Sequence, residues 1–284
     1  MLFRDINTKA KGVALGRRSS PRIKQKKSLG QVFLNTDWPV ERVVQRLKTW
    51  QVKRVLEIGP GAGILTKALL RSGLKVTAVE RDDRFVERLE NYRQTFAEDQ
   101  QERFEIVGED ILKFDLRSWI DRDGDVIAVV GNIPYNISSG IVMWVLPHLE
   151  SLVGVFFLTQ LEFAARLAGR PSTKAYGSLS VFAQLRSDVS LDCKVDRNCF
   201  TPVPKVDSAL VSLRKKKDKL DDELLQKVEN ITRTAFSQRR KTLKNALSTF
   251  LTEESVASCP VDLSRRPDAI RPEEYVDLAK VLLS

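Results

Sequence analysis

The pattern of hydrophobic and polar residues divides the middle of the chain into short apolar runs and longer amphipathic stretches. Five runs have the length and composition of buried strands: residues 54–59, 75–80, 104–110, 125–132 and 154–160. Between them, segments such as "ILTKALLRSG" and "DRFVERLENYRQTF" repeat apolar residues at helical spacing. This alternation predicts an α/β fold, with helices on both faces of a largely parallel sheet.

Two further strand-like runs, 188–196 and 208–215, follow one another without a long helix between them. An antiparallel hairpin at one edge of the sheet is the simplest arrangement for them. After "RKKKDK" (214–219) the spacing becomes helical, at Leu224, Leu225, Val228, Ile231, Ala235 and Phe236. Asp221 or Asp222 can cap this helix, and "RPEEYVDLAKVLL" predicts a last helix with Pro272 in its first turn.

These patterns predict three parts: a flexible basic arm over residues 1–27, an α/β domain over 28–215 and a small all-helical domain over 216–284. The first 28 residues hold nine Lys/Arg and one Asp, which is +8 of the formal net charge of +10. Such a segment could follow a polyphosphate backbone. It could also be a solubilising tail or an organellar transit peptide.

Composition excludes several classes of protein. Neither a membrane-span run nor the apolar core of a signal peptide is visible, so we expect a cytoplasmic protein that does not act at a membrane. Cys193, Cys199 and Cys259 form no CxxC pair, and His148 is the single histidine. Neither a disulfide framework nor a metal site is expected.

The stretch "EIGPGAGILT" places Gly59, Gly61 and Gly63 between the first strand and the first helix. Glycines there let the backbone turn sharply and approach a ligand. Glu80 ends the second strand, where a carboxylate can accept both hydroxyls of a ribose. Asp110 ends the third strand and can accept the amino group of an adenine.

This arrangement serves both dinucleotides and S-adenosylmethionine. The alternative is a tight turn with solvated acids. The absence of a GxxxxGK[ST] motif argues against a nucleoside triphosphatase.

The fourth strand ends in "VVGNIPYNISSG", at the edge where open α/β sheets bind ligands. Asn132 offers a carbonyl acceptor, Pro134 fixes the local chain, and Tyr135 supplies a flat surface on which a base can stack. The three suit an exocyclic amino group on an aromatic ring. A strand that merely ends in a Pro/Asn turn is the alternative.

The motif "NIPYNIS" resembles the Asn-(Leu/Ile)-Pro-Tyr motif of RNA adenine N6-methyltransferases that use S-adenosylmethionine. Further matches follow in order: "LGQVFL" (29–34), "EIGPGAGILT" (57–66), "TKAYGSLS" (173–180), "FTPVPKVDSAL" (200–210) and "AFSQRRKTLKNAL" (235–247). The last stretch and "TKAYGSLS" are similar to the small-subunit ribosomal RNA adenine N6-dimethyltransferases. The resemblance runs from about Leu29 to the C-terminus and implies a Rossmann-like methyltransferase sheet with a C-terminal helical RNA-binding domain.

The resemblance implies a set of cofactor contacts for S-adenosylmethionine: Val32, Leu34, Gly59, Gly61, Glu80, Arg81, Asp110 and Asn132. Glu109 is expected to line the same pocket. The chain departs from the family at Val32, where Asn or His is usual, so only backbone or packing contact can remain there. Leu161 replaces a more common Lys, and Ile133 replaces Leu.

For the chemistry, we expect Asn132 and the carbonyl of Pro134 to accept the two N6 protons of adenine, so that the enzyme works mainly by positioning. Tyr135 is predicted as one wall of an aromatic clamp and Phe200 as the other, although Phe200 could instead close an edge hairpin. RNA contacts are predicted for the arm, for "RKKKDK" and for Arg239, Arg240 and Lys241. The alternative for those three is a solvated helix face.

The resemblance implies dimethylation of two adjacent adenosines near the 3′ end of small-subunit ribosomal RNA, during ribosome biogenesis. The expected partner is a pre-30S-type particle, and the enzyme is expected to be a monomer. Three alternatives stay open: a large-subunit adenine methyltransferase of the macrolide-resistance type, a non-catalytic assembly or transcription factor of the same fold, and, more distantly, a dehydrogenase.

Overall fold

The computed structural model describes residues 32–122, 124–218 and 220–283. These residues form two compact units. The sheet unit comprises residues up to Leu161 together with Ser190–Lys215, and the helical unit comprises Glu162–Val189 and the residues from Lys216 onward. The predicted arm, 1–27, lies outside the described residues.

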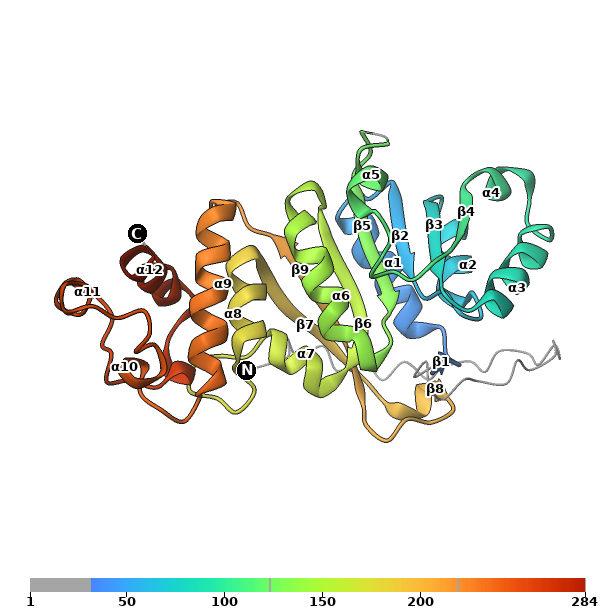
Figure 1. Ribbon diagram of the computed structural model, residues 1–284. Helices are drawn as coiled ribbons and strands as arrows, with labels where there is room; N and C mark the ends of the chain where they lie inside the picture. The colour runs from blue at the N-terminus through green and yellow to red at the C-terminus, as the bar shows by residue number, and fades with distance from the viewer. Residues whose placement is uncertain (1–31, 123, 219, 284) are drawn as a thin grey trace. The chain divides into compact units, whose positions relative to one another are not determined.

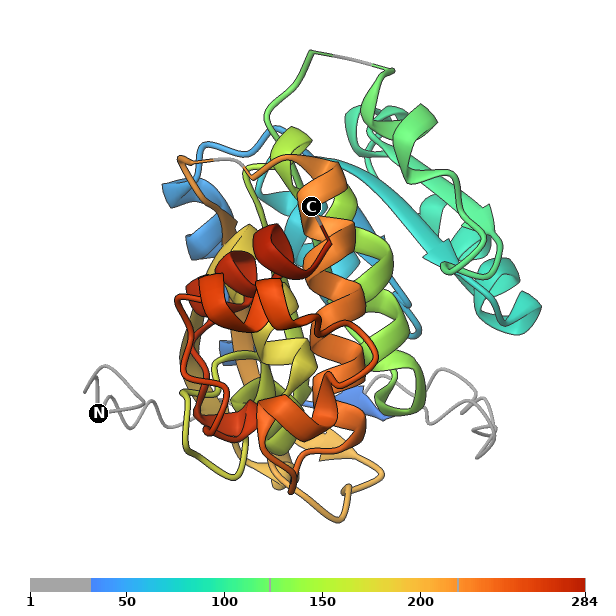
Figure 2. The ribbon, with the colours of Figure 1, turned by 60° about the vertical axis from the view of Figure 1, so that its left-hand side comes forward.

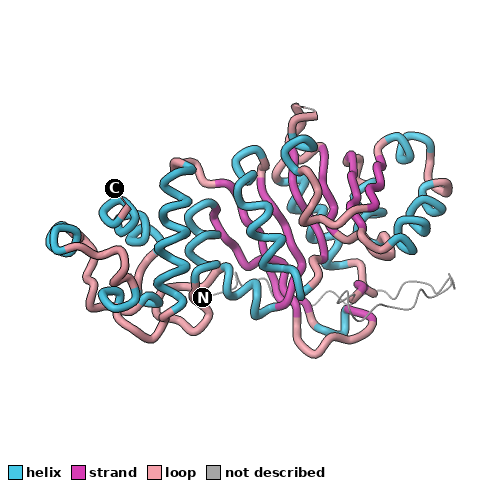
Figure 3. The backbone as a smooth tube through the Cα atoms, in the orientation of Figure 1, coloured by secondary structure: helices cyan, strands magenta, loops and turns pink. Residues whose placement is uncertain are grey.

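The sheet unit is built on a seven-stranded sheet in the order β4-β3-β2-β5-β6-β9-β7. Figures 1 and 3 show the strands side by side. Their bounds are β2 (Arg54–Ile58), β3 (Lys75–Glu80), β4 (Phe104–Gly108), β5 (Ile127–Asn132), β6 (Gly154–Gln160), β7 (Ser187–Val195) and β9 (Ser208–Lys215). Strands β4, β3, β2, β5 and β6 pair in parallel, whereas β9 is antiparallel to β6. The α/β prediction is confirmed, and the two late strands are neighbours at one edge.

The order of the strands places a ligand site in the sheet unit. Strand β2 has β3 on one side and β5 on the other, so the chain changes direction across the sheet between β2 and β5. In open α/β sheets the loops beyond the carboxyl ends of such strands separate and leave a crevice.

The helices of the sheet unit are α1 (Trp38–Thr49), α2 (Ile64–Arg71), α3 (Asp83–Arg93), α4 (Glu98–Glu102), α5 (Leu116–Ile120) and α6 (Ser138–Val145). Apart from α4, which is polar and has no buried residue, each of them buries apolar side chains. Leu47 of α1 and Leu69 of α2 are fully buried in the same cluster as Val55 of β2. Burying each such side chain contributes about 1.5–3 kcal/mol, so this core fixes the turns that leave the strands.

A second, two-stranded sheet joins segments far apart in the sequence. Strand β1 (Phe33–Leu34) pairs antiparallel with β8 (Phe200–Thr201), with Leu34 opposite Phe200. Asn35 strengthens the pairing, because its backbone N–H donates to the Cys199 carbonyl at 2.9 Å. The segment before α1 is therefore held at a defined place.

The helical unit contains α7 (Leu161–Leu167, which starts at the boundary), α8 (Ser178–Arg186), α9 (Asp222–Ser237), α10 (Leu243–Ala246), α11 (Glu253–Ser258) and α12 (Pro272–Leu282). Asp221 caps α9 by accepting from the N–H groups of Glu223 and Leu224. Figures 1 and 2 show α12 beside α9. The structure differs from the predicted division at 162–189, because α8 packs against α9 and α12.

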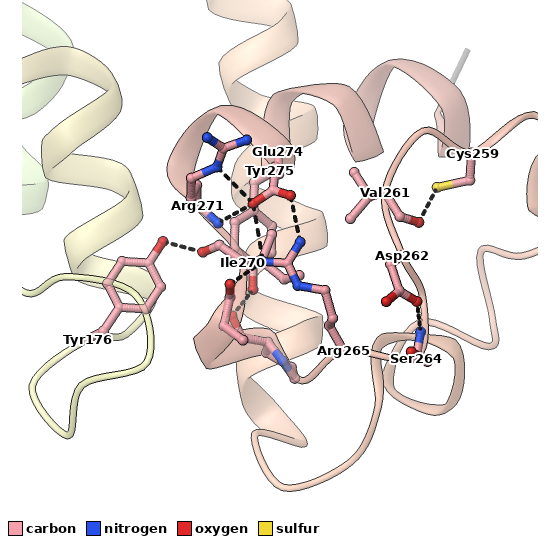
Figure 4. A network of polar contacts seen from close by, with 12 residues as sticks. Tyr176, Cys259, Val261, Asp262, Ser264, Arg265, Ile270, Arg271, Glu274 and Tyr275 are labelled. Carbon is pink, nitrogen blue, oxygen red and sulfur yellow. Dashed lines mark hydrogen bonds and ion pairs between the residues drawn. The ribbon is translucent and has the colours of Figure 1, made fainter.

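Within the helical unit, a polar network connects the loop before α12 to Tyr176 and to α12 itself (Figure 4). The Tyr176 hydroxyl donates to the Ile270 carbonyl at 2.7 Å, and Arg265 pairs with Glu274 at 2.6 Å. Burial disfavours ionisation of Glu274, but hydrogen bonds from Arg265 and Arg271 outweigh it and lower its pKa to about 2. The tyrosine of "TKAYGSLS" thus has a structural contact within this unit.

Candidate active site

One pocket opens at the carboxyl ends of the central strands of the sheet unit. All eight residues predicted for cofactor binding line it: Val32, Leu34, Gly59, Gly61, Glu80, Arg81, Asp110 and Asn132. Glu109, Ile133 and Pro134 line it as well. The predicted residues therefore meet in one place, although they come from five separate segments of the chain.

The glycine-rich turn forms one wall of the pocket. Gly59, Gly61 and Gly63 have φ angles of +61°, +51° and +77°, a region that other residues adopt only with strain. A Cβ atom on Gly61 would lie 2.7 Å from the Phe33 ring, while one on Gly59 would meet nothing within 4 Å. Gly61 thus permits close packing of β1, and Gly59 leaves its backbone open to a ligand.

Glu80 holds its carboxylate at the end of β3. One oxygen accepts from the Asp82 N–H at 2.9 Å and the other from the Gly61 N–H at 3.1 Å. Burial raises the pKa of Glu80, and these backbone hydrogen bonds oppose the rise. Because a carboxylate oxygen can accept more than one hydrogen bond, both oxygens can still bind the hydroxyls of a ribose.

Asp110 lies beyond the end of β4. Its Oδ1 accepts from the Leu112 N–H at 3.1 Å, and its Oδ2 is 3.1 Å from the Arg81 guanidinium. The carboxylate is thus fixed at the pocket with acceptor capacity left for an amino group.

Glu57 lines the pocket and was not singled out from the sequence. Its side chain is 1% exposed and accepts a hydrogen bond from Thr66 Oγ1 at 2.7 Å. Burial raises the pKa of Glu57 to about 8, a hydrogen bond from Thr66 lowers it and the nearby Glu80 raises it. The sequence feature that could have identified Glu57 is the presence of a carboxylate inside the apolar run 54–59.

Asn132 is the last residue of β5, and of the two polar atoms of its side-chain amide one has a hydrogen-bond partner and the other has none among the described residues. Its Nδ2 donates to the Val32 carbonyl at 2.9 Å. Its buried Oδ1 accepts no hydrogen bond from the described residues. An unsatisfied buried acceptor costs about 1–3 kcal/mol, which a ligand donor can recover. The contact at Val32 comes from the backbone, as expected for a residue that lacks a polar side chain.

The carbonyl of Pro134 was predicted to accept an N6 proton, and its hydrogen bonds argue against this role. It already accepts from Ser138 Oγ at 2.9 Å and from the Ile137 N–H at 3.3 Å. Two donors fill both lone pairs of a carbonyl oxygen, so Pro134 is not available to accept an amino proton in this conformation. The carbonyl of Ile133, one residue earlier, accepts from none of the described residues.

Tyr135 begins a short 3₁₀ helix (Tyr135–Ile137) and stands between Pro134 and Asn136, which line the pocket, although it is not itself among the lining residues. Its hydroxyl is 3.0 Å from Ser208 Oγ, and either group can donate. Burial raises the pKa of Tyr135, so the phenol stays neutral near pH 7.

Phe200 does not form a second wall of the site. Its side chain is 0% exposed and belongs to the hydrophobic cluster against which Val32 and Leu34 pack. A ring without exposed surface cannot stack on a base, so the clamp prediction is contradicted and the alternative, an apolar residue that closes strand pairing, holds.

Arg239, Arg240 and Lys241 lie in the helical unit. They follow the end of α9 at Ser237 in a turn, so the expected helix is shorter and the alternative of a solvated helix face does not apply. Arg239 donates to the Thr173 carbonyl at 3.1 Å and contacts Asp268 at 3.4 Å. Arg240 and Lys241 are exposed.

Among the described residues, no His, Cys, Asp or Glu cluster of three or more could hold a metal ion. The helices in the same part of the chain are all too short or too polar to cross a membrane.

The open glycine turn and the acids Glu80 and Asp110 at the strand ends fit a nucleoside cofactor, and Asn132 lines the same pocket. The sheet around the pocket is parallel except for the reversed strand β9 at one side. This combination defines a Rossmann-like methyltransferase that uses S-adenosylmethionine. The sequence profile of the ribosomal RNA adenine dimethylase family matches residues 22–283, and the chain belongs to this family. The family resemblance found in the motifs is confirmed.

Individual relatives agree. The chain is 37% identical over 264 residues to ribosomal RNA small subunit methyltransferase A of Francisella tularensis subsp. novicida (strain U112), covering 91% of this chain and 98% of that protein. It is 37% identical over 262 residues to the protein of the same name from Shewanella loihica, covering 91% and 94%.

Two solved structures share the fold. The 23S rRNA methyltransferase ErmE has a TM-score of 0.64 and 28% identity, over 89% of this chain and 100% of that chain. A dimethyladenosine transferase from Plasmodium falciparum has a TM-score of 0.68 and 23% identity, over 87% and 95%. The second likeness concerns the fold alone.

Proposed function

We propose that this enzyme transfers methyl groups from S-adenosylmethionine to N6 of two adjacent adenosines near the 3′ end of small-subunit ribosomal RNA, giving dimethyladenosine. The family and the curated relatives named as small-subunit methyltransferases support this substrate. The observation that carries the chemistry is the open acceptor Oδ1 of Asn132, buried at the pocket beside the cofactor wall.

The residues of the pocket fit the cofactor by the chemistry of their donors and acceptors. Glu80 would hold the ribose hydroxyls, Asp110 the adenine amino group, and the open backbone at Gly59 would lie against the cofactor. Bound there, the cofactor supplies an electrophilic methyl group on a sulfonium.

Asn132 and its neighbour orient the methyl acceptor. The N6 nitrogen of adenine is a poor nucleophile because its lone pair is delocalised into the ring. Asn132 Oδ1 accepts one N6 proton and the free carbonyl of Ile133 accepts the other, which aims the lone pair at the methyl group. Positioning of this kind can lower a barrier by about 7–11 kcal/mol, so a strong base is not required.

Tyr135 provides the stacking surface for the target base. An adenine must leave its stack to enter the crevice, at a cost of a few kcal/mol, and stacking on an aromatic ring offsets about 1–3 kcal/mol of it. Since the Tyr135 hydroxyl is already bound, the ring is held before the base arrives.

RNA contacts outside the crevice are assigned to basic residues. Exposed Arg240 and Lys241 can meet phosphates, whereas Arg239 contributes mainly by holding residues 173–174 in place. The basic arm and "RKKKDK" would add salt-dependent contacts. The partner is a pre-30S-type particle, on which the enzyme acts as a monomer in the cytoplasm, where such particles assemble.

A transfer assay tests the substrate. The protein is incubated with labelled S-adenosylmethionine and small subunits that lack the modification, large subunits or naked RNA, and modified adenosines are mapped. We expect dimethyladenosine at two adjacent positions in small-subunit RNA. Label confined to large-subunit RNA would favour the large-subunit alternative, and binding without transfer to any RNA would favour a non-catalytic factor.

A further inference from the structure

The reversed strand β9 brings its first residue to the edge where the parallel strands end. Because β9 is antiparallel to β6, Ser208 at its start lies opposite Gln160 at the end of β6. Strand β5 ends at the same edge, and it is followed directly by the turn of residues 133–137, which in the proposed function orients the base that accepts the methyl group. A parallel strand in this place would present its carboxyl end instead, so the reversal is what delivers a residue of "PKVDSAL" to the site.

Ser208 contacts the turn through Tyr135. The serine is 0% exposed, and its Oγ lies 3.0 Å from the Tyr135 hydroxyl. The tyrosine belongs to a short helix that follows Pro134 and lacks a side-chain cap. The hydroxyl contact therefore fixes the far end of the ring, while the backbone fixes the near end.

A second pair of hydroxyls supports the same turn. Ser138 Oγ donates to the Pro134 carbonyl at 2.9 Å and lies 3.4 Å from Thr159 Oγ1 on β6. Both side chains are buried, with exposures of 2% and 0%. The turn is thus attached to β6 through its backbone, and the Tyr135 ring is attached to β9 through its hydroxyl.

We propose that Ser208 is a positioning residue that holds the Tyr135 ring, and that this restraint matters most for the second methyl transfer to each adenosine. The inference rests on the proposed function. Unmethylated N6 offers two protons, so Asn132 and the Ile133 carbonyl can orient it from both sides. Monomethylated N6 offers one proton, and the orientation of the base then depends more on the stacked ring.

The two transfers follow the same balance of atoms and electrons. The N6 lone pair forms the new N–C bond, the C–S bond breaks with its electron pair onto sulfur, and N6 loses one proton to solvent. After the first transfer only one N6 proton remains to orient the base, which is why a loose ring is expected to release the base at the monomethyl stage.

The test is the ratio of monomethyladenosine to dimethyladenosine formed on small-subunit particles, measured over time by mass spectrometry of digested RNA. Ser208→Ala and Tyr135→Phe remove the same contact from its two ends. Each is expected to raise the ratio about 3- to 10-fold, the effect typical of one neutral hydrogen bond. The double variant is expected to match the single variants, because only one contact is lost.

Ser212→Ala is the matched control, since it makes the same change at another buried serine of β9. Its ratio should equal that of the unchanged protein, and a shift as large as that of Ser208→Ala would overturn the inference. Melting temperatures show whether each variant is folded. If Ser208→Ala does not fold, Tyr135→Phe at its half-buried position decides the question.

An unchanged product ratio in folded Tyr135→Phe overturns the role of the Ser208 contact while the proposed function stands. Effects that multiply in the double variant also overturn it, because they show that the two residues act separately. If the unchanged protein makes no dimethyladenosine on small-subunit RNA, the proposed function fails and the inference fails with it.

Discussion

The cofactor side and the acceptor side of the pocket differ in how many of their polar groups already have partners. On the cofactor side, both oxygens of Glu80 and both oxygens of Asp110 are engaged within the protein. On the acceptor side, Asn132 Oδ1 has no partner among the described residues. The cofactor side is prepared in the free protein, whereas the acceptor side is completed only when a donor arrives.

Removing the open acceptor should have the largest effect. Asn132→Ala is expected to lower the rate of transfer on the order of 10³-fold, the size of effect seen when an enzyme loses one preorganised hydrogen-bonding group from its active site. Binding of RNA should stay near normal. Single-turnover transfer and filter binding measure the two quantities. Asn91→Ala, at an exposed amide of α3 that does not line the pocket, is the control. Most of the rate surviving in Asn132→Ala would end the proposed role.

Changing the prepared side should weaken cofactor binding instead. Glu80→Gln keeps the shape but replaces one acceptor oxygen with a donor, so we expect the Kd for S-adenosylmethionine to rise about 10- to 100-fold, the range for charged hydrogen bonds. Calorimetry measures the Kd, and Glu90→Gln on the exposed surface of α3 is the control. A Kd equal to the control would show that Glu80 only supports the glycine turn.

Asp110→Asn should have a smaller effect. The amide can still offer an oxygen to the adenine, and the lost pair with Arg81 is partly exposed, where ion pairs contribute about 0–1 kcal/mol. We expect the Kd to rise about 3- to 10-fold, and an effect larger than that of Glu80→Gln would reverse the ranking of the two acids.

Glu57 allows a test without the cofactor. Its folded pKa of about 8 lies above the usual 4.5, so the folded protein binds a proton there that the unfolded chain has released between those values. The contribution of Glu57 to the free energy of unfolding is therefore greatest below about pH 4.5, and it is lost as the pH rises to about 8. As the pH rises from 5.5 to 8.5, the melting temperature of Glu57→Gln should therefore rise relative to that of the unchanged protein. A constant difference would mean that Glu57 is ionised in the fold.

Local patterns in the sequence predicted the strands and the cofactor residues well. Strands β3, β6 and β9 have the predicted bounds, because their apolar runs end at charged or polar residues. The eight predicted cofactor residues meet in one pocket, since acids and glycines at parallel strand ends converge on one edge.

Long-range contacts explain what the sequence could not show. The pairing of Leu34 with Phe200 buries the phenylalanine that was expected to face the substrate. The Pro134 carbonyl is occupied because Ser138 folds back onto it, which depends on side-chain direction and not on spacing. The segment 162–189 sits between two strand regions in sequence, and only the packing of α8 on α9 and α12 assigns it to the helical unit.

The backbone contact from Val32 to Asn132 has a consequence for how this enzyme can vary in evolution. Any residue at position 32 offers the same carbonyl, so substitutions there leave the acceptor of the Asn132 amide in place. A deletion between Val32 and Leu34 is different, since it would slip β1 by one position against β8 and turn the carbonyl away. Position 32 can therefore tolerate substitution, whereas the number of residues between it and β1 is fixed.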